Sequence, residues 1–414
     1  MFALADCNNF YASCHRLFEP QYNHVPVIVL SNNDGCVIAR SNEAKACGIA
    51  MGAPFFKIRE EIKKHQIAVF SSHYTLYGDI SARVMTNLAR FTPEVEVYSI
   101  DECFLGLSGF ENLKEYGKTI RETVMNNTGI PVSIGIAPTK VLAKVANKTS
   151  KKHNGVMLLE TQQQISDALA DYPVEDLWGI GRQFAHKLIK GGIETAAQFR
   201  ALPVDWVQTH MTIVGARIWR ELWGESCIPL KTILDPKKGM CTSRAFGKLT
   251  GDYHELKEAT SNYAARLAGK LRREKLCTTV LSVKLLTNKF IDQEMQAYPT
   301  ITIPLEHPVN NTLDLINTAL WGLKKIYLRG YQYQKVEVNA TGLIPESEVQ
   351  LNIFSEFKGK KYDQVSKVLD QLNLHYGAGT LRMAGEGKNQ KWTMKREFMR
   401  PHYTTNWKDI IKVK

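Results

Sequence analysis

Three carboxylates occupy positions from which they could share metal ions. Asp101 and Glu102 are adjacent in an alternating stretch, and Asp6 follows the short apolar run 2–5. Carboxylate oxygens are the ligands that Mg²⁺ prefers, and Mg²⁺ keeps further positions for water and phosphate oxygens. Two such ions can hold the attacking and leaving oxygens of a phosphoryl transfer. A single acid at a strand end more often faces water, so the prediction of a catalytic metal site depends on all three.

Aromatic and basic residues near these acids fit a nucleotide. Phe10 and Tyr11 directly follow the first carboxylate, and a flat ring there could lie under a sugar, although ordinary core packing explains the pair as well. Lys and Arg give charge-assisted hydrogen bonds to phosphate oxygens, but each alone is typical of a solvated surface. The candidate phosphate ligands are Arg40, Lys45, Lys151 and Lys152.

The surrounding pattern predicts the elements that position these residues. Residues 94–105 alternate as a strand, which would direct Asp101 and Glu102 to opposite faces. Both acids can therefore reach one site only if the chain bends, and we expect a hairpin or sheet edge there. The other expected elements are strands 2–5, 25–30 and 131–136 and helices 76–88, 113–129 and 139–150. This order suggests a split β-α-β sheet with helices on one side.

Composition indicates a multidomain protein with a polyanionic partner. The chain has 414 residues and a formal net charge of +12. This length predicts two to four domains, and the charge fits a polyanion such as nucleic acid, although a generally basic protein without a specific ligand fits the charge alone as well. Basic residues concentrate between 231 and 335, with Lys270, Arg272, Arg273 and Lys275 as DNA-contact candidates or as a solvated helix face.

Two further segments suggest contacts with other molecules. Gly179-Ile180-Gly181 resembles the turn of a helix-hairpin-helix, whose amides approach DNA phosphates, although a plain helical turn fits as well. Residues 175–199 are expected to form helix, turn and helix. A polar region carries Gln350, Leu351, Ile353 and Phe354, which suit a partner's hydrophobic pocket or a local packing contact.

Cysteine usage and the N-terminus point to the cytosol. The eight cysteines form no C-x-x-C pair and lie in apolar stretches, which favours reduced, buried thiols. The first residues have no basic segment before an apolar run, so we expect no signal peptide. No apolar run is long enough for a membrane span.

The motifs together resemble the Y-family of translesion DNA polymerases. The matching residues are Asp6 with Phe10-Tyr11, then Ser99–Leu105, and Gly135–Lys144. Leu30–Arg40 and Tyr403-Thr404-Thr405 are similar to the UmuC-type branch, the catalytic subunit of bacterial DNA polymerase V. The resemblance runs from end to end of the chain.

The resemblance implies an α+β right-hand polymerase. A ferredoxin-like palm, small fingers, a helical thumb with the helix-hairpin-helix and an α+β little finger are expected. The implied boundaries are palm 1–19 and 78–165, fingers 20–77, thumb 166–235, little finger 240–345 and a clamp-binding tail at 346–414.

The resemblance also implies residue roles. Asp6, Asp101 and Glu102 would hold two Mg²⁺ ions, together with the main-chain carbonyl of Cys7. Tyr11 would be the steric gate against ribonucleotides, and Arg40, Lys45 and Lys151 would bind the triphosphate. The family's usual Tyr-Glu-Ala-Arg is Asn42-Glu43-Ala44-Lys45 here, so Lys45 acts as a point charge and Asn42 lacks a tyrosine's reach.

The implied partners are primer-template DNA, a dNTP, a processed UmuD-type dimer, RecA and a sliding clamp bound by the segment at Gln350. The implied function is error-prone translesion synthesis in the SOS response, in the cytoplasm and at the nucleoid. Two alternatives remain at this point. A DNA-binding scaffold would need none of the three acids, and a nucleotide cyclase on the same palm would not need the basic region.

Overall fold

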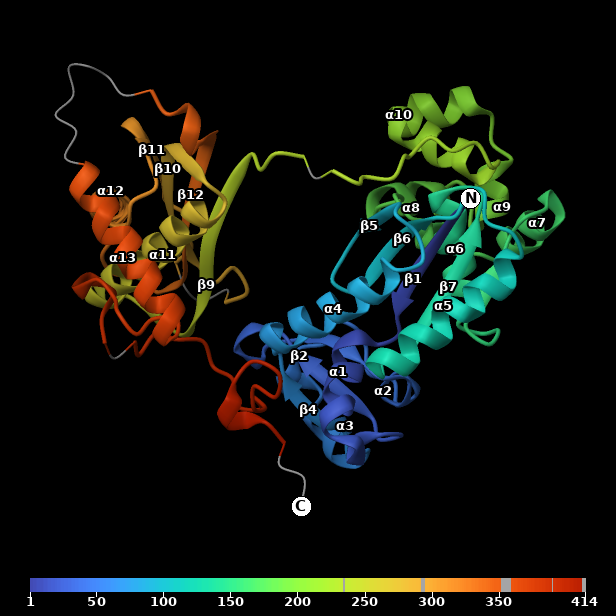
Figure 1. The fold of residues 1–414 in the computed structure, drawn as a ribbon, viewed down its shortest axis with the longest axis horizontal. Coiled ribbons are helices and arrows are strands. Elements are labelled where there is room, and N and C mark those ends of the chain that lie inside the picture. The colour runs from blue at the N-terminus through green and yellow to red at the C-terminus, as the bar shows by residue number, and fades with distance from the viewer. Residues whose placement is uncertain (234, 292–294, 351–358, 389, 412–414) are drawn as a thin grey trace. The chain divides into compact units, whose positions relative to one another are not determined.

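The chain forms two compact units with mixed α and β structure (Figure 1). The computed structural model describes residues 1–233, 235–291, 295–350, 359–388 and 390–411. Unit 1 comprises Met1–Ser31, Gly35–Leu234 and Phe398–Lys414, and unit 2 comprises Asn32–Asp34 and Asp235–Glu397. The predicted α+β multidomain class is confirmed.

A five-stranded sheet in unit 1 carries the three acids. Its strands are β1 (Phe2–Cys7), β5 (Val95–Val97), β6 (Glu102–Gly106), β7 (Val132–Ala137) and β8 (Val156–Leu158), in the order β5-β6-β1-β7-β8. Within this five-stranded sheet, β7 and β8 pair in parallel, and the other neighbouring strands pair antiparallel. The central strand β1 therefore has an antiparallel neighbour on each side.

Helices cover both faces of this sheet, so the expectation of helices on one side was wrong. Ala3, Ala5 and Cys7 face a core shared with α4 (Tyr74–Leu88) and α5 (Leu113–Thr128). Leu4 points the other way, toward α6 (Lys140–Ser150). Gly135 allows α6 to approach the sheet closely, because a Cβ at this position would lie 2.0 Å from the backbone nitrogen of Asn147.

The alternating stretch 94–105 is two strands rather than one. β5 and β6 pair antiparallel. The amides of Tyr98 and Ser99 both donate to the carbonyl of Glu102, at 3.0 and 3.1 Å, and so close a tight turn. The expected hairpin is confirmed, and it places Asp101 in the turn and Glu102 at the first position of β6.

A smaller sheet lies within residues 20–77. Its strands are β2 (Val27–Leu30), β3 (Val37–Arg40) and β4 (Ala68–Ser71), in the order β3-β2-β4. The accompanying helices are α1 (Phe10–Phe18), α2 (Asn42–Ala46) and α3 (Arg59–Lys64). The hydroxyl of Ser41 accepts from the amide of Ala44 and thereby caps α2, the helix that carries Lys45.

Residues 162–222 contain a series of helices joined by short connections. The helices are α7 (Gln162–Ala170), α8 (Arg182–Lys190), α9 (Ala196–Arg200) and α10 (Val204–Leu222), and α10 is interrupted at Thr212, where φ is 62°. The expected helix before Gly179 is only the 3₁₀ turn Val174–Asp176. The second expected helix is present as α8, which begins directly after Gly181.

Unit 2 is a four-stranded antiparallel sheet with helices. Its elements are β9 (Gly239–Thr250), α11 (Tyr253–Arg273), β10 (Leu276–Thr287), β11 (Thr300–Val309), α12 (Thr312–Ile326), β12 (Tyr333–Pro345) and α13 (Gly359–Tyr376). The sheet order is β11-β10-β12-β9, and α11 and α12 pack against each other. Trp392 is buried in this core, so the region expected as a tail contributes to unit 2.

Most of the cysteines are buried or partly buried. All eight cysteines are free thiols, but Cys241 is exposed, so the expectation of burial was wrong there. Among the described residues, no helix combines the length and apolar character that a bilayer crossing requires.

Candidate active site

Strand register brings the three acids to one edge of the five-stranded sheet. Asp6 and Glu102 are direct partners in the β1–β6 pair, so their side chains share a face. Beside them, the amide of Cys7 donates to the carbonyl of Asp101 at 2.9 Å. The hydroxyl of Ser99 donates to Oδ1 of Asp101 at 2.6 Å and accepts from the amide of Glu102 at 3.0 Å. The turn thereby fixes Asp101 next to the Asp6–Glu102 pair.

Two lysines from α6 and its C-terminal end partly neutralise this edge. Nζ of Lys151 lies 3.0 Å from Oδ1 of Asp6, and Nζ of Lys144 lies 2.8 Å from Oε1 of Glu102. With these ion pairs in place, no three His, Cys, Asp or Glu side chains in the described parts of the chain are arranged closely enough to hold a metal ion. The three acids are near one another, but Asp6 and Glu102 are each paired to a lysine ammonium group.

The charges on this edge nevertheless fit divalent cations. Burial is the largest influence on Asp6 and raises the pKa of its carboxyl. Lys151 acts in the opposite direction, while the nearby charges of Glu102 and Asp101 raise that pKa further. Three mutually repelling carboxylates are hard oxygen donors, and cations relieve their repulsion. The two lysine ammonium groups supply that positive charge here.

The Cys7 thiol is turned away from the acids. It is buried in the core under the opposite face of the sheet, and burial raises its pKa well above the ordinary value. A thiol held protonated is a poor metal ligand. Only the main chain of Cys7 is therefore available for the predicted role.

Lys144 is a site residue that sequence reasoning missed. Its ammonium group lies over the ring of Tyr98 at 4.5 Å and near the rings of Trp178 and Phe104, at 5.5 and 5.8 Å. Nε1 of Trp178 donates to the hydroxyl of Tyr98 at 2.9 Å, which fixes two of the rings. The spacing of Lys144 and Lys151, two helical turns apart, was a signal that could have identified it.

A second group of cations gathers around Lys45. Its Nζ donates to the side-chain oxygens of Asn9 at 2.7 Å and Asn42 at 3.3 Å. Burial lowers the pKa of Lys45, and the positive charges of Lys151 and Arg40 lower it further. The charges of Lys151 and Arg40 therefore both act on Lys45, and an anion bound there would relieve this repulsion. Asn42 serves as a hydrogen-bond partner of Lys45.

Tyr11 lies on an aromatic platform. Its ring stacks on Tyr77 with centroids 4.1 Å apart and an interplanar angle of 12°, and Tyr74 meets it edge-on at 6.3 Å. Burial raises the pKa of Tyr11, as do Tyr74 and the negative charge of Asp101. The Tyr11 ring is therefore supported by Tyr77, and the negative charge of Asp101 acts on its hydroxyl group.

The predicted DNA contacts are only partly free to act. Gly179 and Gly181 are exposed at the N-terminus of α8, as a phosphate contact requires. In unit 2, Arg272 donates to both carboxylate oxygens of Asp370 at 2.7 and 2.8 Å, so much of its guanidinium is engaged within the protein. The exposed members of this set are Lys270, Arg273 and Lys275.

The predicted clamp motif is mostly outside the described residues. Gln350 is exposed, whereas Leu351, Ile353 and Phe354 lie outside them.

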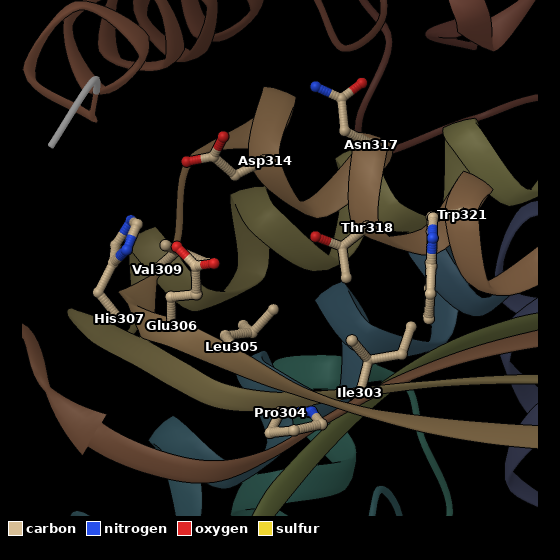
Figure 2. Close-up of a pocket in the computed structure, with 10 residues that line it drawn as sticks. All are labelled: Ile303, Pro304, Leu305, Glu306, His307, Val309, Asp314, Asn317, Thr318 and Trp321. Atoms are coloured by element: carbon tan, nitrogen blue, oxygen red, sulfur yellow. The ribbon is translucent and has the colours of Figure 1, made fainter. Parts of the chain in front are cut away.

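Unit 2 also contains a cavity of about 410 Å³ between β11 and α12 (Figure 2). Its lining includes the acids Glu306 and Asp314, which would repel phosphate. None of the predicted site residues line it.

Family models match most of the chain. The impB/mucB/samB family matches residues 5–148, and the C-terminal domain of that family matches residues 237–353. A domain of unknown function, DUF4113, matches residues 363–413. The first match contains the three acids together with Arg40, Lys45 and Lys144, and it ends three residues before Lys151.

Similar proteins cover the full length. Protein UmuC of Salmonella typhimurium strain LT2 is 42% identical over all of both chains, and protein SamB of Salmonella typhimurium is 39% identical, also over all of both. DNA polymerase IV of Clostridium acetobutylicum is 28% identical, with 83% of this chain and 85% of that one covered.

Solved structures show the same fold. A Y-family DNA polymerase chimera of Dbh and Dpo4 matches 83% of this chain and 100% of its own, with a TM-score of 0.67 and 19% identity. The insertion ternary complex of Dbh DNA polymerase matches with the same coverage, a TM-score of 0.56 and 18% identity. The right-hand architecture of palm, fingers, thumb and little finger is thereby confirmed. The chain belongs to the impB/mucB/samB family and is a Y-family DNA polymerase of the UmuC type.

Proposed function

We propose that this error-prone translesion DNA polymerase of SOS mutagenesis performs nucleotidyl transfer at the palm edge formed by Asp6, Asp101 and Glu102. The observation that carries the proposal is the register of Asp6 opposite Glu102, with Asp101 in the adjoining turn. Family membership makes it a DNA-directed DNA polymerase that acts on DNA and dNTPs and belongs to a group that uses divalent metal ions.

The proposed metal ligands are the three carboxylates and the main-chain carbonyl of Cys7. Two Mg²⁺ ions bound there would supply Lewis acidity at the reacting phosphate and at the primer hydroxyl. In this proposal Lys151 and Lys144 hold the acids ionised and separated before substrate arrives. The two ammonium groups reach the acids from α6 and its C-terminal end. The lysines can therefore leave the carboxylates without any movement of the sheet.

In the proposed reaction, the primer 3′-oxygen attacks the α-phosphorus of the dNTP. The new bond is O3′–Pα, the bond from Pα to the pyrophosphate oxygen breaks, and the hydroxyl proton passes to solvent. Lys45, Arg40 and Lys151 would hold the triphosphate, because an anion relieves the repulsion that Arg40 and Lys151 exert on Lys45. Tyr11 would lie under the sugar and exclude a 2′-hydroxyl, since Tyr77 prevents its ring from retreating.

We further propose DNA contacts outside the palm. The exposed amides at Gly179 and Gly181 would bind backbone phosphate, and Lys270, Arg273 and Lys275 would follow the backbone without reading sequence. Arg272 belongs to the same predicted set, but its pairing with Asp370 gives it fewer free donors.

The proposed partners follow from the similarity to UmuC. They are a processed UmuD-type dimer, RecA, and a sliding clamp bound through Gln350 and the residues after it. Clamp binding would raise the effective concentration of the enzyme at the primer end. We propose that the protein acts in the cytoplasm, at the nucleoid.

Primer extension on an undamaged and an abasic template tests the catalytic assignment. The wild type is compared with Asp101→Ala, with Mg²⁺, dNTPs, clamp and accessory proteins present. We expect extension past the abasic site by the wild type and its loss in Asp101→Ala, with DNA binding retained. Normal extension by the variant would refute the metal assignment, and DNA binding without synthesis by either protein would favour the scaffold alternative.

A further inference from the structure

The last part of the chain contacts β4, an edge strand of the three-stranded sheet β3-β2-β4. Residues from Phe398 onward belong to unit 1, and this segment, drawn in red, lies beside β4 in Figure 1. The amide of Ser71 donates to the carbonyl of Phe398 at 3.1 Å, and the amide of Phe398 donates to the hydroxyl of Ser71 at 3.0 Å. The Phe398 ring meets Phe55 edge-on at 5.5 Å. The segment is therefore fixed by backbone and side-chain contacts.

Arg400 is the central side chain of this contact. Its Nε lies 3.1 Å from a carboxylate oxygen of Glu19, which is only 9% exposed. Its guanidinium covers the ring of Phe70 at 5.0 Å, and Nη2 donates to the hydroxyl of Tyr22 at 3.1 Å. The pair is partly buried, with 34% of the Arg400 side chain and 11% of the Glu19 side chain exposed, and it orients these groups more than it adds net stability. Arg400 therefore holds Phe70 and the end of α1 in one arrangement.

A continuous series of contacts leads from Arg400 to Tyr11. Phe70 stacks on His15, with centroids 4.2 Å apart and an interplanar angle of 14°. Nε2 of His15 lies 2.8 Å from the hydroxyl of Tyr77, and Tyr77 stacks on Tyr11 at 4.1 Å. Phe70, His15 and Tyr77 are each 0% exposed. Close packing leaves such a series little freedom to shift one member alone.

A second contact fixes the start of the helix that carries Tyr77. Nδ1 of His73 accepts from the amide of Leu76 and so caps α4. The proton of a neutral His73 is then on Nε2, which lies 3.3 Å from the carbonyl of Pro401. The His402 ring packs edge-on against His73 at 4.5 Å. The same C-terminal segment thus contacts both Phe70 and the N-terminus of α4.

We propose that residues 398–403 brace the Tyr11–Tyr77 platform and that Arg400 is a positioning residue for sugar selection. This would give part of the region matched by a domain of unknown function a role in the active site. The proposal rests on the proposed function of Tyr11 as the steric gate. Arg400 acts through Phe70, His15 and Tyr77 and touches no substrate.

Arg400→Ala, Arg400→Lys and Lys408→Ala test the brace in the full chain. Lys408 is exposed in the same segment and serves as the matched control. Amide hydrogen exchange across residues 10–18 and 70–80 reports the brace without any substrate. We expect faster exchange in both ranges for Arg400→Ala, a smaller change for Arg400→Lys and none for Lys408→Ala. Unchanged exchange in folded Arg400→Ala would overturn the brace.

The proposed effect on sugar selection is tested by the preference for dNTP over rNTP, measured as a ratio of kcat/KM values. A displacement of about 1 Å in a reacting geometry costs on the order of 100-fold, so a smaller shift of Tyr11 should lower this preference about 10-fold. The double variant Tyr11→Ala with Arg400→Ala should match Tyr11→Ala alone. If the two substitutions lower the preference additively, Arg400 does not act through Tyr11 and the proposal is refuted. An unchanged preference in Tyr11→Ala itself would refute the gate, while the exchange result would still decide the brace.

Discussion

Replacing Lys151 by Met should weaken dNTP binding, because the substitution keeps the side-chain length and removes the charge. Lys151 lies 3.0 Å from Asp6 and is close enough to lower the pKa of Lys45. A hydrogen bond to a charged group contributes about 1.5–3 kcal/mol, which corresponds to a KM increase of roughly 10- to 150-fold. Lys151 is partly exposed, so we expect the lower end of that range.

The same substitution should also shift the pH profile. Burial raises the pKa of Asp6 and Lys151 lowers it, so loss of Lys151 raises that pKa further. Protonated Asp6 cannot serve as a ligand, and the acidic limb of kcat/KM should therefore move to higher pH. Lys152→Met is the matched control, since it removes the same charge from the adjacent exposed residue. Steady-state kinetics across pH measure both effects. A larger loss in Lys152→Met than in Lys151→Met would refute the assignment.

Two further predictions depend on single contacts, and a third depends on the predicted clamp motif. Lys144→Met should lower stability by about 1–3 kcal/mol in thermal unfolding and reduce kcat, because Glu102 loses a partly buried partner. Burial lowers the pKa of His15 to about 3, so the stability it contributes is complete above pH ~6.5 and falls as the pH drops. Between pH 7.5 and 5.5 this loss is about 1.4 kcal/mol, and denaturant unfolding should show a smaller loss in His15→Asn. Replacing Leu351 and Phe354 by Ala should reduce clamp-dependent primer extension and spare distributive extension, whereas equal loss of both would indicate a folding defect.

Local sequence patterns were sufficient for the palm elements. The helix expected at 113–129 is Leu113–Thr128, and the strand expected at 131–136 is Val132–Ala137. Periodicity and an end signal such as Gly129 are contained within each segment. The hairpin at Asp101 was predictable for a chemical reason, because two adjacent acids in a straight strand cannot face one site.

Long-range contacts were beyond the same reasoning. Nothing near Arg400 in the sequence indicates that it meets Glu19 or Phe70, since that contact depends on how distant segments pack. The helices on both faces of the five-stranded sheet were missed for a similar reason. The close approach of α6 depends on Gly135 being opposite that helix, which only the folded register reveals.

The register also explains how three acids can remain side by side before substrate binds. Asp6 and Glu102 face each other across β1 and β6, an arrangement that is destabilising for like charges. Lys144 and Lys151 are seven residues apart, so two turns of α6 place one ammonium group on each acid. A site built to receive cations is thus stabilised by the ammonium groups of its own lysines before metal ions bind. We therefore expect Lys144 and Lys151 to matter both for folding of the free enzyme and for the step in which substrate enters.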